Sequence, residues 1–101
     1  MKIPTSIRVA GQVYAIQVMD RDWYSDTAKR GQCCRESLII RIAEGMPKTR
    51  TQETLIHEIG HAIYHEYNVS AGQEEEDIVS QFCTGLHQVL IDNPDLWKAM
   101  K

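Results

Sequence analysis

A chain of 101 residues that is 43% hydrophobic and 25% charged has the composition of one small globular domain and lacks the length for a second core. Its formal net charge of -3 argues against a nucleic-acid-binding protein, which would normally carry a basic stripe. No apolar run approaches the ~20 residues of a membrane span, and no signal-peptide core follows the first residues. We therefore expect a single cytoplasmic domain over residues 1–101, without nucleic-acid or membrane partners.

The first half of the chain predicts two strand pairs, because apolar and polar residues alternate with period two. The strands expected are 7–9, 14–18, 32–34 and 38–42. In the last of them, Leu38, Ile40 and Ile42 are expected to face the core. The polar stretch 19–31 has weak periodicity and predicts a loop.

The second half predicts helices about 50–67, 74–91 and a short one starting at Pro94. Thr49, with Gln52 three residues later, resembles a capping box for the first helix, and Asn68 is expected to end it. Asn93 is expected as the N-cap of the third helix. Strands followed by helices indicate an α+β fold, with a small antiparallel or mixed sheet of about four strands before the three helices.

The apolar sides of the later helices define which of their residues should pack. The second helix is expected to bury Val79, Phe82, Leu86, Val89 and Leu90. Leu96 and Trp97 of the short third helix are expected to dock on the core.

Residues 57–61 read His-Glu-Ile-Gly-His and match H-E-x-x-H within the first long helix. Two histidines four residues apart lie on one helix face, so His57 and His61 can both reach one metal ion, predicted to be Zn²⁺. Glu58 is placed to take a proton from a metal-bound water. A glycine at position 60 makes the helix less stable by about 1 kcal/mol than an alanine would, which indicates a packing or functional reason for the glycine.

A hydrolytic zinc site needs a third protein ligand. The next helix opens with four acidic residues, 74–77. Acidic residues in a first turn are also favoured by the helix dipole, by ~0.3–1 kcal/mol each, with no metal involved. Periodicity places Glu76 towards the packed side, so Glu76 is the preferred third ligand and Glu75 the alternative.

The remaining histidines and the cysteines are also potential metal ligands. His65 lies one turn beyond His61 and about 12 Å along the helix from His57, too far for one ion to bind all three histidines. His87 is expected to be structural, although a histidine ligand from the second helix stays open. Three cysteines, two of them adjacent, predict reduced thiols and not a disulfide framework. Cys34 precedes H-E-x-x-H as a cysteine does in peptide deformylases, whose remaining motifs are not visible here.

The motif at 57–61, together with EEEDIVSQFCTGL at 74–86, resembles the ImmA/IrrE-type metallopeptidases and the single-domain minigluzincins, most closely the small phage-encoded members. The resemblance covers about residues 32–97 and includes the Asp-Asn-Pro turn at 92–94. It implies a minimal gluzincin fold, with zinc held between the sheet-bound helix and a glutamate-bearing helix by His57, His61 and Glu76, and with Glu58 as the base. Ser80 stands where the broader family has asparagine. No helix-turn-helix domain is present, so repressor cleavage is not carried over.

The function expected is that of a zinc metallopeptidase in which a metal-activated water hydrolyses a peptide bond. A peptide or protein substrate could add as a strand to 38–42, the expected sheet edge. Tyr64 and His65 are the nearest candidates for stabilising the oxyanion. The alternative is a zinc-stabilised binding or regulatory module of phage origin with little or no protease activity. A fourth protein ligand, such as Cys34 or His87, would favour that alternative.

Overall fold

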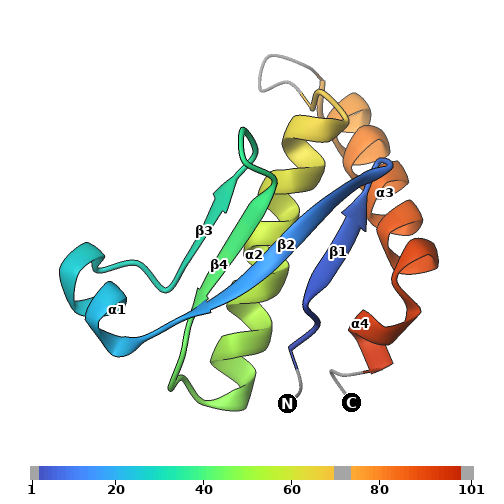
Figure 1. The fold of residues 1–101 in the computed structure, drawn as a ribbon. Coiled ribbons are helices and arrows are strands. Elements are labelled where there is room, and N and C mark those ends of the chain that lie inside the picture. The colour runs from blue at the N-terminus through green and yellow to red at the C-terminus, as the bar shows by residue number, and fades with distance from the viewer. Residues whose placement is uncertain (1–2, 70–73, 99–101) are drawn as a thin grey trace.

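The computed structural model describes residues 3–69 and 74–98 and places two long helices against a four-stranded sheet (Figure 1). The elements are β1 (Ser6–Val9), β2 (Gln12–Met19), α1 (Arg21–Thr27), β3 (Gly31–Cys34), β4 (Ile39–Ala43), α2 (Lys48–Glu66), α3 (Glu75–Asp92) and α4 (Pro94–Lys98). α2 packs against β3 and β4, and α3 packs beside β1. The α+β prediction, four strands followed by two long helices and a short one, is confirmed. None of the described helices is long and apolar enough to cross a lipid bilayer.

The strand order is β1-β2-β4-β3, with antiparallel outer pairs and a parallel central pair. The parallel register places Ile16 beside Ile40 and Val18 beside Ile42. Because β4 is hydrogen-bonded on both sides, the expectation that strand 38–42 forms the sheet edge is wrong. β3 is the edge strand on that side.

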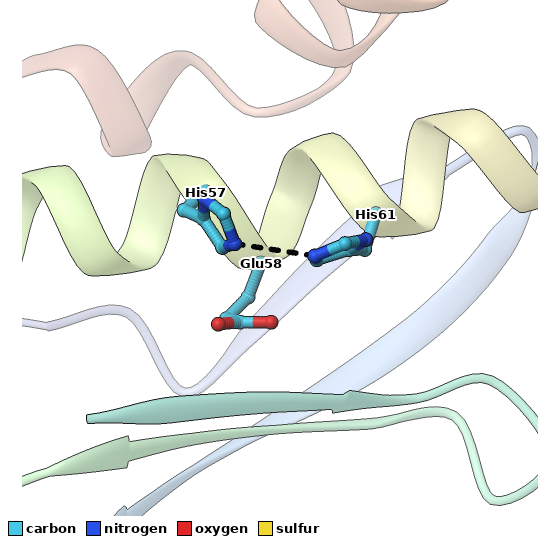
Figure 2. Close-up of side chains that lie close together, drawn as sticks. All are labelled: His57, Glu58 and His61. Carbon is cyan, nitrogen blue, oxygen red and sulfur yellow. Dashed lines mark hydrogen bonds between the residues drawn. The ribbon is translucent and has the colours of Figure 1, made fainter. Parts of the chain in front are cut away.

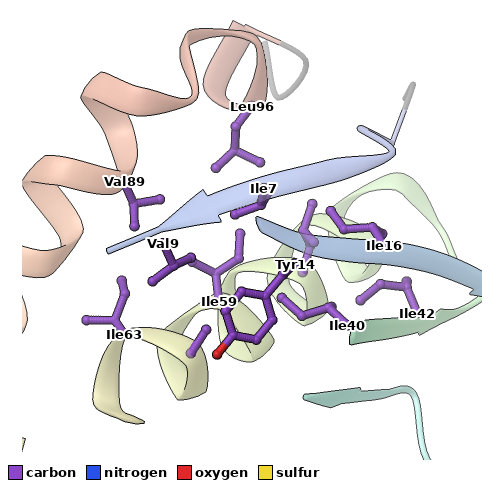
Figure 3. Close-up of a cluster of buried hydrophobic side chains, with 12 residues drawn as sticks. Ile7, Val9, Tyr14, Ile16, Ile40, Ile42, Ile59, Ile63, Val89 and Leu96 are labelled. Carbon is purple, nitrogen blue, oxygen red and sulfur yellow. The ribbon is translucent and has the colours of Figure 1, made fainter. Parts of the chain in front are cut away.

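One face of the sheet forms the core, because buried and exposed residues alternate along the strands. Ile40 and Ile42 of β4 are fully buried, as predicted, whereas Leu38 is half-buried in the turn before β4, at a φ of 56°. The side chains that meet in this core (Figure 3) are Ile7, Val9, Tyr14, Ile16, Ile40, Ile42, Leu55, Ile59, Ala62, Ile63, Val89 and Leu96.

α1 corrects the prediction of a loop over 19–31. The carboxylate of Asp20 accepts a hydrogen bond from the Trp23 backbone N–H at 3.1 Å and caps the helix. Ala28 ends it in the left-handed conformation, with φ 57°. None of its residues is buried, so the segment has no apolar stripe that sequence periodicity could detect.

The ends of α2 agree only in part with the prediction. The helix begins at Lys48 behind Pro47, and no side chain caps it, so the capping box at Thr49 is wrong. Proline fixes its own φ and commonly precedes a first turn, which places the start slightly earlier. Asn68 adopts a φ of 53° and ends the helix as predicted.

The buried side of α3 is narrower than expected. Val89 is buried and Phe82 and Leu86 are half-buried, but Val79 and Leu90 are exposed. The helix lies beside β1 at the end of the sheet, so only one narrow face of it meets the core. In α4, Leu96 is buried while the side chain of Trp97 is 43% exposed, which corrects the expectation for Trp97.

Asn93 connects the end of α3 to the free edge of β1. Its side-chain Oδ1 accepts from the Arg8 backbone N–H at 2.9 Å, and its Nδ2 donates to the Arg8 carbonyl at 2.8 Å. The Nδ2 group also donates to the Val89 carbonyl at 2.8 Å. The predicted N-cap side chain of α4 therefore pairs with a strand edge instead, and only the backbone carbonyl of Asn93 bonds to α4, at Leu96.

Tyr14 offers a test of how the sheet is joined to α2. Its buried ring carries a hydroxyl that donates to Glu66 Oε1 at 3.0 Å, and burial together with this bond raises the pKa of the phenol. We expect Tyr14→Phe to lower the free energy of unfolding by about 1–2 kcal/mol, because a hydrogen bond to a charged group is lost. Urea denaturation measures the change. Tyr24→Phe, at an exposed tyrosine, should leave the midpoint unchanged.

Candidate metal centre

His57 and His61 lie one turn apart on the exposed side of α2 and point towards each other (Figure 2). Their Nε2 atoms are 3.2 Å apart, with the two rings at 79°. Two nitrogen ligands on one tetrahedral zinc ion, with bonds of 2.0–2.1 Å, lie roughly 3.3 Å apart. The two side chains therefore have the spacing that a shared metal ion requires, as the sequence predicts.

Glu58 points from the same turn of α2 towards β3, and its residue is only 7% exposed (Figure 2). Its carboxylate belongs with the two histidines to a group of potential ligand atoms that all lie within 4.8 Å of one another. Burial raises the pKa of this carboxyl group, and the charges of His57, His61 and Lys29 oppose the rise. A desolvated carboxylate beside two histidines that could ligate a metal ion has the properties expected of a general base.

Gly31, at the start of β3, explains how closely the strand passes over Glu58. A Cβ atom at this position would lie 2.9 Å from Glu58 Oε2 and 2.7 Å from Thr54 Cγ2. Only a glycine therefore allows the backbone of β3 to approach the carboxylate without displacing it. No local pattern in the sequence indicates this role of Gly31, because the contact depends on packing between distant segments.

Glu76 lies exposed in the first turn of α3, together with Glu75 and Asp77. It is not part of the group formed by His57, Glu58 and His61. Residues 70–73, which lead from α2 towards α3, lie outside the described residues. The assignment of Glu76 or Glu75 as third ligand stays a prediction.

The other potential ligands are engaged elsewhere or exposed. Cys34 Sγ accepts from Arg41 Nη1 at 3.1 Å, and His87 is exposed on α3. His65 Nδ1 lies 3.1 Å from Arg35 Nη1, and it must accept this bond because a guanidinium only donates. In residues 3–69 and 74–98, none of these three joins the histidine pair as a further ligand.

A cavity of about 530 Å³ opens beside His57 and Glu58. Its walls come from the end of α1, from the residues that lead into β3 and from α2, and they include Tyr24, Lys29 and Arg30. The sequence predicts a loop over residues 19–31 and indicates no functional residue in it. Its place beside the histidines follows only from the packing of α1 and β3 next to α2.

A pair of convergent histidines with a buried carboxylate between helix and strand defines a metallopeptidase-type centre. The family model for the IrrE N-terminal-like domain, Peptidase_M78, matches residues 12–96, and the chain belongs to this family. This confirms the resemblance to ImmA/IrrE-type metallopeptidases. No curated protein and no solved structure matches the chain.

Proposed function

We propose that the protein is a zinc-dependent metallopeptidase, with His57 and His61 as zinc ligands, Glu76 as the third ligand and Glu58 as the general base. The observation that carries this proposal is the 3.2 Å separation of the two Nε2 atoms with the buried Glu58 carboxylate beside them. Zinc bound there would supply a Lewis acid that activates water for attack on a peptide carbonyl. The family assignment supports a peptidase-type reaction.

In this proposal Glu58 moves the proton. Its carboxylate accepts a proton from the attacking water and delivers it to the leaving amine. The raised pKa makes Glu58 a stronger base than an exposed glutamate, and burial beside β3 leaves its residue only 7% exposed.

The edge of β3 is the place proposed for an extended substrate, in place of strand 38–42. β3 pairs with β4 on one side only, and its first residue, Gly31, touches Glu58. A peptide added to this edge by backbone hydrogen bonds would pass close to the histidines. The opposite edge, on β1, is already engaged by Asn93.

Metal analysis of protein purified without a histidine tag tests the ligand set. We expect about one zinc ion per chain. We expect Glu76→Gln to weaken zinc binding by about tenfold to a hundredfold. Glu75→Gln is the matched control, because it removes the same charge from the same helical turn. A loss confined to Glu75→Gln would move the ligand to Glu75, and unchanged binding in both variants would exclude either glutamate.

Hydrolysis is tested separately from binding. The zinc-loaded protein is incubated with a diverse peptide mixture, and new termini are detected by mass spectrometry, with and without a chelator. Chelator-sensitive cleavage supports the peptidase. Zinc that raises the melting temperature without any cleavage would contradict it and favour the zinc-stabilised binding module.

A further inference from the structure

The cavity beside Glu58 carries two cationic side chains that the metal site does not use. Lys29 and Arg30 lie between α1 and β3 and line the cavity together with His57 and Glu58. Lys29 is near enough to Glu58 for its charge to act on that carboxyl group. A substrate group in this cavity would therefore lie beside the proposed general base, next to the bond to be cleaved.

The cavity wall pairs neither of these two cations directly with a carboxylate, and Glu58 is the acidic group of the wall on which the charge of Lys29 acts. Within the described part of the chain, neither the Lys29 nor the Arg30 side chain forms an ion pair. Glu53, the other acidic residue of the wall, lies 3.3 Å from Arg50 Nη1 and is balanced by it. With Glu53 balanced by Arg50, the wall carries the two cations Lys29 and Arg30 against the single carboxylate of Glu58, on a chain whose net charge is -3.

We propose that this cavity is a substrate subsite that binds a carboxylate through Lys29 and Arg30, next to the scissile bond. The inference rests on the proposed peptidase function and names its substrate class, an acidic peptide. A guanidinium presents parallel N–H donors that match the two oxygens of a carboxylate, and an ammonium adds a second charge. The carboxylate comes either from an aspartate or glutamate side chain or from the C-terminus of the peptide.

The test compares peptides that differ only by Glu, Gln or Lys on either side of the cleaved bond, each as a free acid and as a C-terminal amide. The wild type should cleave the Glu peptides with about tenfold higher kcat/KM than the Gln peptides, as two partly exposed ion pairs allow. Lys29→Gln/Arg30→Gln should abolish this preference. Arg8→Gln/Lys98→Gln is the matched control, because it removes the same charge from β1 and α4, far from the cavity, and should keep the preference.

A second readout separates failure of the subsite from failure of the peptidase. Binding of the same peptides, labelled with a fluorophore, is measured by anisotropy on the zinc-loaded protein. Cleavage without an acidic preference, or a preference that survives in Lys29→Gln/Arg30→Gln, would overturn the subsite and leave the peptidase standing. Binding of acidic peptides that requires Lys29 and Arg30 but is not followed by cleavage would support the subsite and overturn the peptidase. The absence of both binding and cleavage would overturn both proposals. An effect seen only with free acids assigns the subsite to the peptide C-terminus.

Discussion

Glu58→Gln is expected to lower kcat for peptide hydrolysis by a factor of about 10²–10⁴, the usual contribution of a general base. Glutamine keeps the shape of the side chain against Gly31 and Thr54 but cannot take up the proton. Zinc content should stay near the wild-type value, because His57 and His61 are unchanged. Turnover of a cleaved peptide and metal analysis of the same sample measure both quantities.

The control for Glu58→Gln is Glu44→Gln, which removes the same charge from an exposed position after β4. It should leave turnover and zinc content unchanged. The melting temperature of Glu58→Gln should not fall, because a buried carboxylate with a raised pKa is itself costly to desolvate. Turnover that matches the wild type would rule out Glu58 as the base.

Gly85→Ala is expected to lower the free energy of unfolding by about 1–2 kcal/mol. A Cβ at this buried position of α3 would lie 2.6 Å from Ile63 Cγ2 and 2.8 Å from Tyr67 Cδ2. Overpacking of this kind costs about 1–3 kcal/mol, against a gain of about 0.5–1 kcal/mol from replacing glycine in a helix. The melting temperature should fall by roughly 5–10 °C in a domain of this size.

Gly60→Ala is the matched control on α2. A Cβ there would lie 3.8 Å from Phe82 Cζ, an ordinary contact, so the substitution should raise the free energy of unfolding by about 0.5–1 kcal/mol. The expectation that Gly60 is kept for packing is therefore not supported by the contact with Phe82. Equal stability of the two alanine variants would show that α2 and α3 do not approach as closely as described.

Local periodicity predicted those parts of the fold that depend on neighbouring residues. The spacing of four residues fixes His57 and His61 on one turn, and alternation fixes which of Ile39, Ile40 and Ile42 face the core. Neither pattern says which strands are neighbours. The parallel pairing of β2 with β4, which makes β3 the edge, comes from long-range packing that the sequence does not display.

The surroundings of the metal site were harder to predict for the same reason. Gly31 meets Glu58 across 27 positions of the chain (58 − 31), and the cavity with Lys29 and Arg30 depends on the packing of α1 beside α2. α1 buries no residue, so only the cap formed by Asp20 could have indicated it. Glu76 is indicated by periodicity and resemblance, and because it lies exposed in the first turn of α3, its role as third ligand stays a prediction.

The bond between Asn93 and Arg8 has a consequence for how this sheet can associate. An open strand edge is a template for another strand, and a sheet with two open edges can add copies without end. Asn93 occupies one edge, so pairing through β3 is isologous and stops at two chains. In such an antiparallel pair, Lys29 and Arg30 before β3 would lie near Arg35 after β3 of the copy, where Arg35 already pairs with Glu36 at 3.7 Å. Like charges at both ends of β3 would thus oppose pairing with a second copy, whereas the proposed acidic substrate strand would be attracted to the same edge.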